Sequence, residues 1–176
     1  MYPKPYIDFL VHFHGLRDYF ECHEILEEHW KSEPRGSRKD YWVGLIQVAV
    51  ALYHQRRCNF SGALRMMESA LSIIEREQDA IDHLGLDSSK LRALLRERTN
   101  DLRQNNPYKS INLPINDNHL LLLCEQECKH VGCVYGMPSD LGNEYLIHKH
   151  TKRDRSDVIE ERIEQKLLRE KGRTDS

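Results

Sequence analysis

The 176-residue chain lacks an apolar run long enough to cross a bilayer. Its longest apolar stretch, residues 43–53, is interrupted by Gln47 and is far shorter than the roughly 20 residues that a membrane-spanning helix needs. Residues 1–5 also lack the basic and apolar segments of a secretory signal peptide. We therefore expect a cytoplasmic protein without a membrane segment.

The chain also lacks an excess of either charge, since its net charge is −2 and its pI is about 6.5. A protein without a basic excess has little general attraction to nucleic acid, so we do not expect nucleic acid as a partner. The one locally basic stretch, residues 149–155, has no interleaved aromatic residues and is followed by acidic ones. This pattern favours a solvated helix entry or a protein contact. No glycine-rich phosphate loop is present, and no Ser or Cys has a base at a recognisable spacing.

A paired cysteine framework is missing as well, because the five cysteines are an odd number and show no disulfide pattern. We expect reduced thiols. Cys124, Cys128, His130 and Cys133 could form a closed zinc site, but their spacing fits no standard zinc knuckle, and buried free cysteines on one helix face are the alternative. Three further histidines could complete or replace a ligand of such a site: His119, His148 and His150.

The sequence does contain strong helical periodicity, which predicts an all-α fold. Apolar residues recur at helical spacing in five segments, which we place at about 5–14, 19–31, 39–58, 62–83 and 88–104. Asp18, Ser61 and Asp87 or Ser88 are the expected N-caps, and short connections favour antiparallel neighbours. We therefore predict a compact bundle of about five helices in residues 1–106. Residues 107–176 are predicted to be a C-terminal helical extension that packs on the bundle or on a partner, with helices near 120–127 and from Asp157 onward.

The most informative stretch is residues 19–30, which carries an imidazole and a carboxylate on an apolar helix side. On a helical wheel the apolar side chains gather on one side: Leu16, Tyr19, Phe20, Leu26 and Trp30. His23 falls near the middle of that side and Glu27 lies beside it, one turn on. An unpaired polar group in an apolar interior costs about 1–3 kcal/mol, so another side chain or a metal ion must compensate.

The next helix offers partners for this pair. Its apolar run contains Gln47 as the only polar side chain, and His54 follows on the same stripe. If both helices point these groups at one place, His23, Glu27 and His54 would suit Zn²⁺, Mn²⁺ or Fe²⁺ and would leave a position open for water. Gln47 would then orient the water or a small-molecule substrate, and Glu24 would be a ligand, a supporting residue or a general base.

The same residues also permit a structure without a metal. A hydrogen-bonded network from His23 to Glu27 and from Gln47 to His54 would fix helix packing and nothing more. The chain would then be a non-enzymatic helical module whose extension binds a protein partner or a second copy of the chain. The sequence leaves both hypotheses open.

The motif set resembles the bacterial and archaeal family called domain of unknown function 309. The residues that carry the resemblance span about residues 9–75 and are Tyr19-Phe20-Glu21, His23-x-x-x-Glu27-x-x-Trp30, Gly44-Leu45-Ile46-Gln47, His54, Asn59 and Gly62-Ala63. The resemblance implies a small all-α fold with a histidine–glutamate motif suspected of binding metal, and sometimes the label of metal-dependent hydrolase, but no established reaction. Cys22 stands where alanine is common in the family, and the helical wheel predicts that it points off the apolar side. Residues 107–176 resemble an extension that only some members share.

Overall fold

A computed structural model describes residues 1–152, 163–164 and 166–167. The fold is all-α, as predicted, and no helix in the described part is long and apolar enough to cross a membrane. The cytoplasmic location stays a prediction. The α-helices are α1 (Lys4–Val11), α2 (Tyr19–Ser32), α3 (Asp40–Arg56), α4 (Phe60–Arg76), α5 (Gln78–His83), α6 (Ser88–Arg103), α7 (Asn118–Val131), α8 (Glu144–Ile147) and α9 (Lys149–Lys152).

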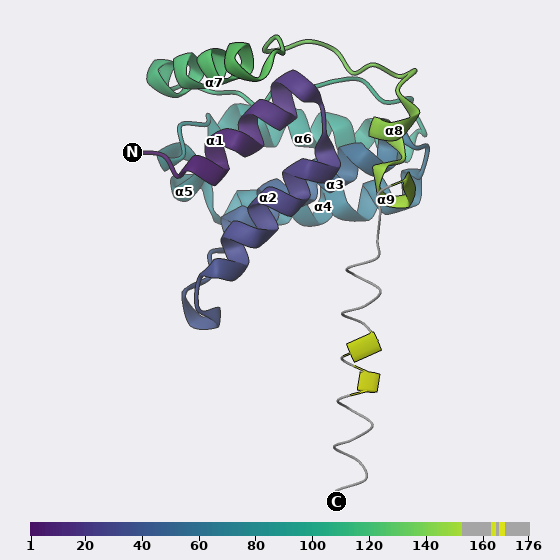
Figure 1. Cartoon of the computed structure of the whole chain (residues 1–176), viewed down its shortest axis with the longest axis horizontal. Helices are drawn as coiled ribbons and strands as arrows, with labels where there is room; N and C mark the ends of the chain where they lie inside the picture. Colours follow the sequence, from purple (N-terminus) through teal and green to yellow (C-terminus); the bar gives the residue numbers. More distant parts are fainter. Residues whose placement is uncertain (153–162, 165, 168–176) are drawn as a thin grey trace, which may run out of the picture.

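Helix α3 is the centre of the bundle. Its apolar residues cover nearly every face, so it needs neighbours on several sides. It packs against both α2 and α4, and α6 packs on α4 (Figure 1). Gly44 lets α4 come close, because a Cβ at this position would lie 3.0 Å from Cγ2 of Ile73. The predicted helical bundle is therefore built around one largely buried helix.

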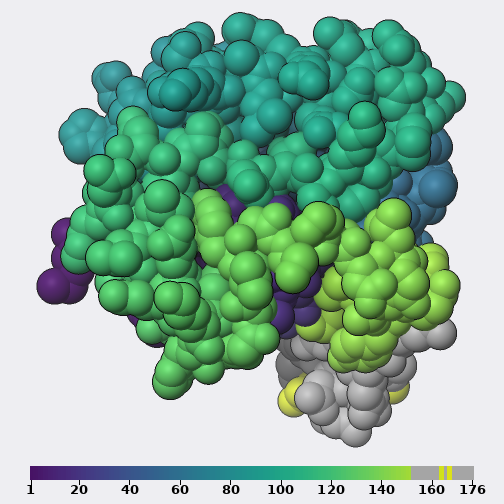
Figure 2. Space-filling model, turned by 90° about the horizontal axis from the view of Figure 1, so that it is seen from above, coloured from purple at the N-terminus to yellow at the C-terminus, as the bar shows by residue number. Residues whose placement is uncertain are grey.

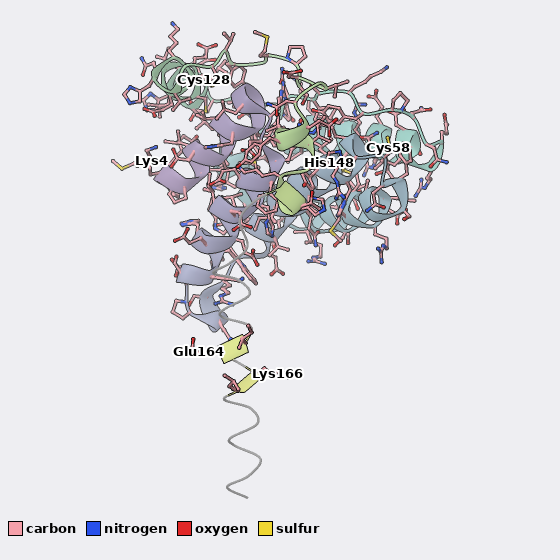
Figure 3. All side chains as sticks on the ribbon, turned by 45° about the vertical axis from the view of Figure 1, so that its right-hand side comes forward. Lys4, Cys58, Cys128, His148, Glu164 and Lys166 are labelled. Atoms are coloured by element: carbon pink, nitrogen blue, oxygen red, sulfur yellow. The ribbon has the colours of Figure 1, made fainter. Side chains whose placement is uncertain are left out.

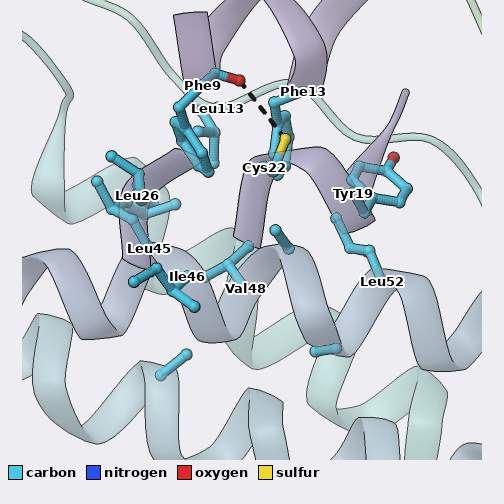
Figure 4. Close-up of a cluster of buried hydrophobic side chains, with 14 of the residues drawn as sticks. Phe9, Phe13, Tyr19, Cys22, Leu26, Leu45, Ile46, Val48, Leu52 and Leu113 are labelled. Atoms are coloured by element: carbon cyan, nitrogen blue, oxygen red, sulfur yellow. Dashed lines mark hydrogen bonds between the residues drawn. The ribbon is translucent and has the colours of Figure 1, made fainter. Parts of the chain in front are cut away.

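The inward face of α2 differs from the helical-wheel prediction by one residue. Its fully buried side chains are Tyr19, Cys22 and Leu26, and Cys22 points into the core, where its thiol donates to the Phe9 carbonyl oxygen at 3.6 Å (Figure 4). The prediction that Cys22 points off the apolar side was therefore wrong. His23 lies at the edge of the buried face, with a side chain that is 32% exposed. The face shifts because α1 packs on α2 from the side of Cys22.

Helix boundaries mostly follow the predicted capping residues. Asp18 accepts from the Glu21 backbone N–H, and Asp87 caps α6 in the same way. Helix α4, however, is capped by Asn59 and not by Ser61. The predicted helix over residues 62–83 is two helices, because the chain turns at Glu77 and brings Ile81 of α5 into the core.

A turn of π-helix, His12–Leu16, follows α1 and replaces the last part of the helix predicted for residues 5–14. Leu16 lies in this turn, ahead of α2, so it does not follow the periodicity of α2 and is 38% exposed. Arg17 then adopts the left-handed conformation, with φ of 53°, and is only 2% exposed. The chain needs this sharp corner to bring α2 back across α1.

The Arg17 guanidinium binds the described part of the extension to the bundle. It donates to the carbonyl oxygens of Ile111 (2.5 Å), Met137 (2.8 Å) and Phe13 (3.1 Å) and to Oδ1 of Asn112 (2.7 Å). Figure 2 shows α7 and the segment after it lying over the N-terminal residues, which are visible in the gaps between them and at the left edge. The core is continuous with this extension. The division of the chain after residue 106 stays a prediction, and the predicted helix from Asp157 lies largely outside the described residues.

His14 is a second buried link between the bundle and the extension. Its Nδ1 lies 2.8 Å from the Leu10 carbonyl oxygen and its Nε2 accepts from the Leu113 backbone N–H at 2.9 Å. These partners require the neutral imidazole with the proton on Nδ1, since a carbonyl oxygen accepts and a backbone N–H donates. Burial lowers the pKa of His14 from 6.5 to about 3. Protonation of Nε2 would remove the acceptor for Leu113.

We expect acid to destabilise the fold through His14. A histidine whose pKa is lowered by folding takes up its proton first in the unfolded chain, so stability is lost as the pH falls below 6.5 toward about 3. One such proton costs about 1.4 kcal/mol per pH unit. Urea unfolding of His14→Asn, which cannot titrate, should therefore show a shallower decline of the free energy of unfolding between about pH 6 and pH 4.5. An unchanged slope would contradict this assignment.

Candidate ligand pocket between the second and third helices

Helices α2, α3 and α9 enclose a pocket of about 190 Å³. It brings His23 and His54 together at one cavity, from two helices that pack side by side. The residues that line the pocket are Tyr19, Phe20, His23, Val50, Tyr53, His54, Arg57 and His150. Of the residues singled out in the sequence for a metal, two therefore line the pocket and Glu27 does not.

The ring of His23 lies between two carboxylates of its own helix. Nδ1 is 3.3 Å from Oε1 of Glu24, and Nε2 is 3.1 Å from Oε2 of Glu27. The other oxygen of Glu27 lies 2.7 Å from Nζ of Lys31. These groups are each about one-third exposed or more, so the ion pairs are partly screened by water. Each ring nitrogen of His23 thus lies close to a carboxylate oxygen from α2 itself.

His54 has its tautomer fixed by Asn59. Oδ1 of Asn59 accepts from the Gly62 backbone N–H at 3.2 Å, which caps α4 and identifies this atom as the oxygen. The amide nitrogen of Asn59 therefore faces Nδ1 of His54, at 3.2 Å. Because an amide nitrogen only donates, Nδ1 must accept, and a neutral His54 carries its proton on Nε2.

The environment keeps His54 in this neutral form. Burial lowers the pKa of His54, and the positive charges of Arg57 and Arg65 lower it further. Arg57 lies with its guanidinium 5.3 Å from the centre of the Tyr53 ring, and its buried Nε has no hydrogen-bond partner within the described residues. The residues that line the pocket thus include a neutral imidazole with its proton on Nε2 and the cation of Arg57.

The extension closes the pocket through α9. Nζ of Lys149 lies 2.6 Å from Oδ2 of Asp18 and 3.4 Å from Oε2 of Glu21, which fastens α9 to the start of α2. The Tyr53 hydroxyl accepts from the His150 backbone N–H at 3.1 Å and lies 2.5 Å from Nδ1 of the same residue. The first part of the basic stretch therefore makes protein contacts.

Sequence reasoning missed Arg57 and the place of His150. Arg57 follows His54 by three residues, and this one-turn spacing on α3 was an available signal. His150 was considered only as a ligand for the cysteine cluster, and no local pattern connects it with α2 and α3. Its position depends on the long-range ion pairs of Lys149.

The metal site stays a prediction. In the part of the chain that the structure describes, no three or more His, Cys, Asp or Glu side chains are grouped so that they could hold a metal ion. Gln47 does not line the pocket, and its buried Oε1 has no partner among the described residues. A neutral His54 with its proton on Nε2 is a donor at that nitrogen, whereas a metal needs a lone pair.

The second metal candidate does not converge either among the described residues. Cys124 and Cys128 are buried on α7, whereas His130 is exposed on the other side of that helix. Cys133 packs near Cys128 beyond the helix end. Cys124 and Cys128 are therefore buried free cysteines on one helix, which is the alternative that the sequence left open.

Comparisons with known proteins place residues 6–66 in a family described as "Domain of unknown function (DUF309)". An uncharacterised protein of Bacillus subtilis (strain 168), YpuF, is 51% identical over 173 residues, which cover 98% of this chain and 99% of that protein. No solved structure matches the chain. The match to YpuF extends beyond the bundle and includes the extension that closes the pocket.

We expect Asn59→Asp to raise the pKa of His54. An aspartate still caps α4, but its carboxylate attracts the proton to Nδ1, which should raise the pKa by about 1–2. A pH titration of the His54 ring protons by NMR measures this shift. Asn59→Ser is the matched control, because serine caps the helix without a charge and should not raise the pKa in this way. Equal shifts in both variants would contradict the role assigned to Asn59.

Proposed function

We propose that this protein, which belongs to the DUF309 family, binds a small organic anion in the pocket between α2, α3 and α9. The observation that supports this most directly is the donor character of the pocket. Asn59 fixes the donor on Nε2 of His54, and Arg57 adds a charge that no carboxylate of the described residues neutralises.

The walls of the pocket favour a ligand with an apolar part. Tyr19, Phe20, Val50 and Tyr53 contribute aromatic and aliphatic surface, and the cavity of about 190 Å³ suits a molecule with only a few carbon atoms or a single ring. A carboxylate on such a molecule could accept from Nε2 of His54 and pair with Arg57. Hydrogen bonds to charged groups contribute about 1.5–3 kcal/mol each.

Three of the acidic residues near the pocket already have a lysine as a neighbour. Asp18 and Glu21 pair with Lys149, and Glu27 pairs with Lys31. None of these carboxylates lines the cavity. An anion in the pocket would therefore meet the positive charge of Arg57 with limited opposition from these groups.

Benzoate is a suitable probe, because it combines one ring with one carboxylate. We expect it to shift the NMR signals of His54 and Tyr53 saturably, and Arg57→Gln to weaken its binding roughly 10- to 100-fold through loss of the charge-assisted contact. Benzyl alcohol, which has the ring without the charge, should bind much more weakly.

Arg65→Gln is the matched control for this experiment. Arg65 is exposed on α4 and lies outside the pocket, so its loss removes the same charge without a contact to the probe. Equal weakening in the two variants would mean only a general electrostatic effect. Absence of saturable shifts with benzoate at millimolar concentration would overturn the proposal for aromatic carboxylates.

A divalent metal ion bound by His23, Glu27 and His54, as in a metal-dependent hydrolase, is the second candidate. The observation that favours it is that His23 and His54 line one cavity while Glu27 lies 3.1 Å from Nε2 of His23. In this case Zn²⁺, Mn²⁺ or Fe²⁺ would require His54 to present the lone pair of Nε2. Glu24 would then be the general base that the sequence suggests, whereas Gln47 does not line the cavity in which it was expected to orient the water.

Zinc titration of protein without a polyhistidine tag tests this candidate. A metal at the site should bind with one equivalent and be lost in both His23→Ala and Glu27→Ala. Asn59→Asp should tighten zinc binding, since a carboxylate on Nδ1 favours the Nε2 lone pair, and it should weaken benzoate binding. Zinc binding that neither alanine variant changes would contradict the metal candidate.

A further inference from the structure

Cys128 and Cys133 lie on the two sides of the end of α7. The Cys133 backbone N–H donates to the Cys128 carbonyl oxygen at 2.8 Å, and the Gly132 N–H donates to the Lys129 carbonyl oxygen at 3.2 Å. Gly132 has a φ of 82°. This is the Schellman arrangement of a helix end, in which the side chains of the first and last residues contact each other. Here, both of those residues are cysteines.

The two sulfur atoms meet over Gly15 of the π-helical turn. A Cβ built on Gly15 would lie 2.5 Å from Sγ of Cys133 and 2.9 Å from Sγ of Cys128. Both distances are measured from the same Cβ position on Gly15, so the two sulfur atoms cannot be farther apart than the sum of these distances. Glycine is needed here because a larger side chain would occupy the place of the sulfurs. The pair therefore fits a site formed jointly by α7 and the bundle.

The exposure of the two thiols differs in a way that suits sequential oxidation. Cys133 is partly exposed, whereas Cys128 is buried. Burial, together with its interaction with the Cys133 thiol, raises the pKa of Cys128 to about 12, so Cys128 is a poor first nucleophile. Cys133 is the thiol that a dissolved oxidant reaches first.

We propose that Cys128 and Cys133 form a reversible disulfide with peroxide as the oxidant. The Cys133 sulfur attacks one peroxide oxygen, the O–O bond breaks, and a sulfenic acid and one water form. The Cys128 sulfur then attacks the sulfenic sulfur, an S–S bond forms, and the sulfenic oxygen leaves as a second water. Two thiols lose two electrons and two protons, and one hydrogen peroxide is reduced to two waters.

The disulfide would fasten the segment that covers the corner between α1 and α2. Gly136, three residues after Cys133, donates its backbone N–H to the His14 carbonyl oxygen at 2.9 Å, and Met137 accepts from Nε of Arg17 at 2.8 Å. A covalent bond at Cys133 ties this segment to α7. We therefore expect oxidation to raise Tm and to slow hydrogen exchange of the Gly136 amide.

The experiment uses the full chain with Cys58→Ser as background. Cys58 is exposed and, as Figure 3 shows, far from Cys128, so its removal prevents disulfides between chains without touching the site. After treatment with hydrogen peroxide and alkylation, trypsin separates the pair at Lys129 into peptides 110–129 and 130–149. We expect these peptides to be linked with a loss of two hydrogens, and a thiol reductant to separate them.

Further variants assign the bond and allow it to be refuted. Cys124 shares a tryptic peptide with Cys128, so Cys124→Ser should keep the link and Cys128→Ser should abolish it. Cys133→Ser should abolish both the link and the rise in Tm. Stable sulfenic or sulfinic acid at Cys133 without a link, or a link that persists in Cys128→Ser, would overturn the proposal.

Discussion

The corner at Arg17 is the constraint on which the rest of the structure depends. A cation buried to 2% exposure is satisfied by four oxygen atoms, and no carboxylate of the described residues takes part. Leaving such acceptors or such a charge without partners would cost several kcal/mol, so the arrangement allows few alternatives. It fixes the turn between α1 and α2 and the path of the extension across them. The backbone oxygen of Arg17 also accepts from Arg56 at 2.8 Å, which ties the corner to the end of α3.

The candidate pocket forms where these constraints meet. The corner sets the start of α2, and Asp18 and Glu21 at that start receive Lys149 of α9. His150 then reaches Tyr53 on α3. The third wall of the pocket is therefore supplied by a helix almost a hundred residues away in the sequence. A ligand in the pocket would contact the bundle and the extension together, so its binding would be coupled to how well the extension is docked.

The chemistry of the pocket follows from one side-chain amide. Asn59 has to satisfy the first turn of α4 with its oxygen, which leaves only its nitrogen for His54. Imidazoles facing a common cavity are readily interpreted as metal ligands, yet a histidine ligates only through a free lone pair. In this protein, the capping of α4 by Asn59 also sets the tautomer of His54. This tautomer would favour a ligand that accepts a hydrogen bond from Nε2 of His54.

Much of the fold could be predicted from the sequence, because helical periodicity and capping residues act locally. The all-α fold and the caps at Asp18 and Asp87 are confirmed. The inward face of α2 could not be predicted to one residue, since the packing of α1 decides that Cys22 and not His23 is buried. The shared cavity of His23 and His54 agrees with the predicted pairing of two helices, whereas the place of His150 in the pocket depends on contacts of the extension that no local pattern predicts.

The ring nitrogens of His54 offer the most direct test of the central claim. Their ¹⁵N chemical shifts in protein labelled at histidine, recorded at neutral pH, report which nitrogen carries the proton. The account predicts an unprotonated Nδ1 and a protonated Nε2. A protonated Nδ1 with a bare Nε2 would contradict it, because the pocket would then present a lone pair suited to a metal ion.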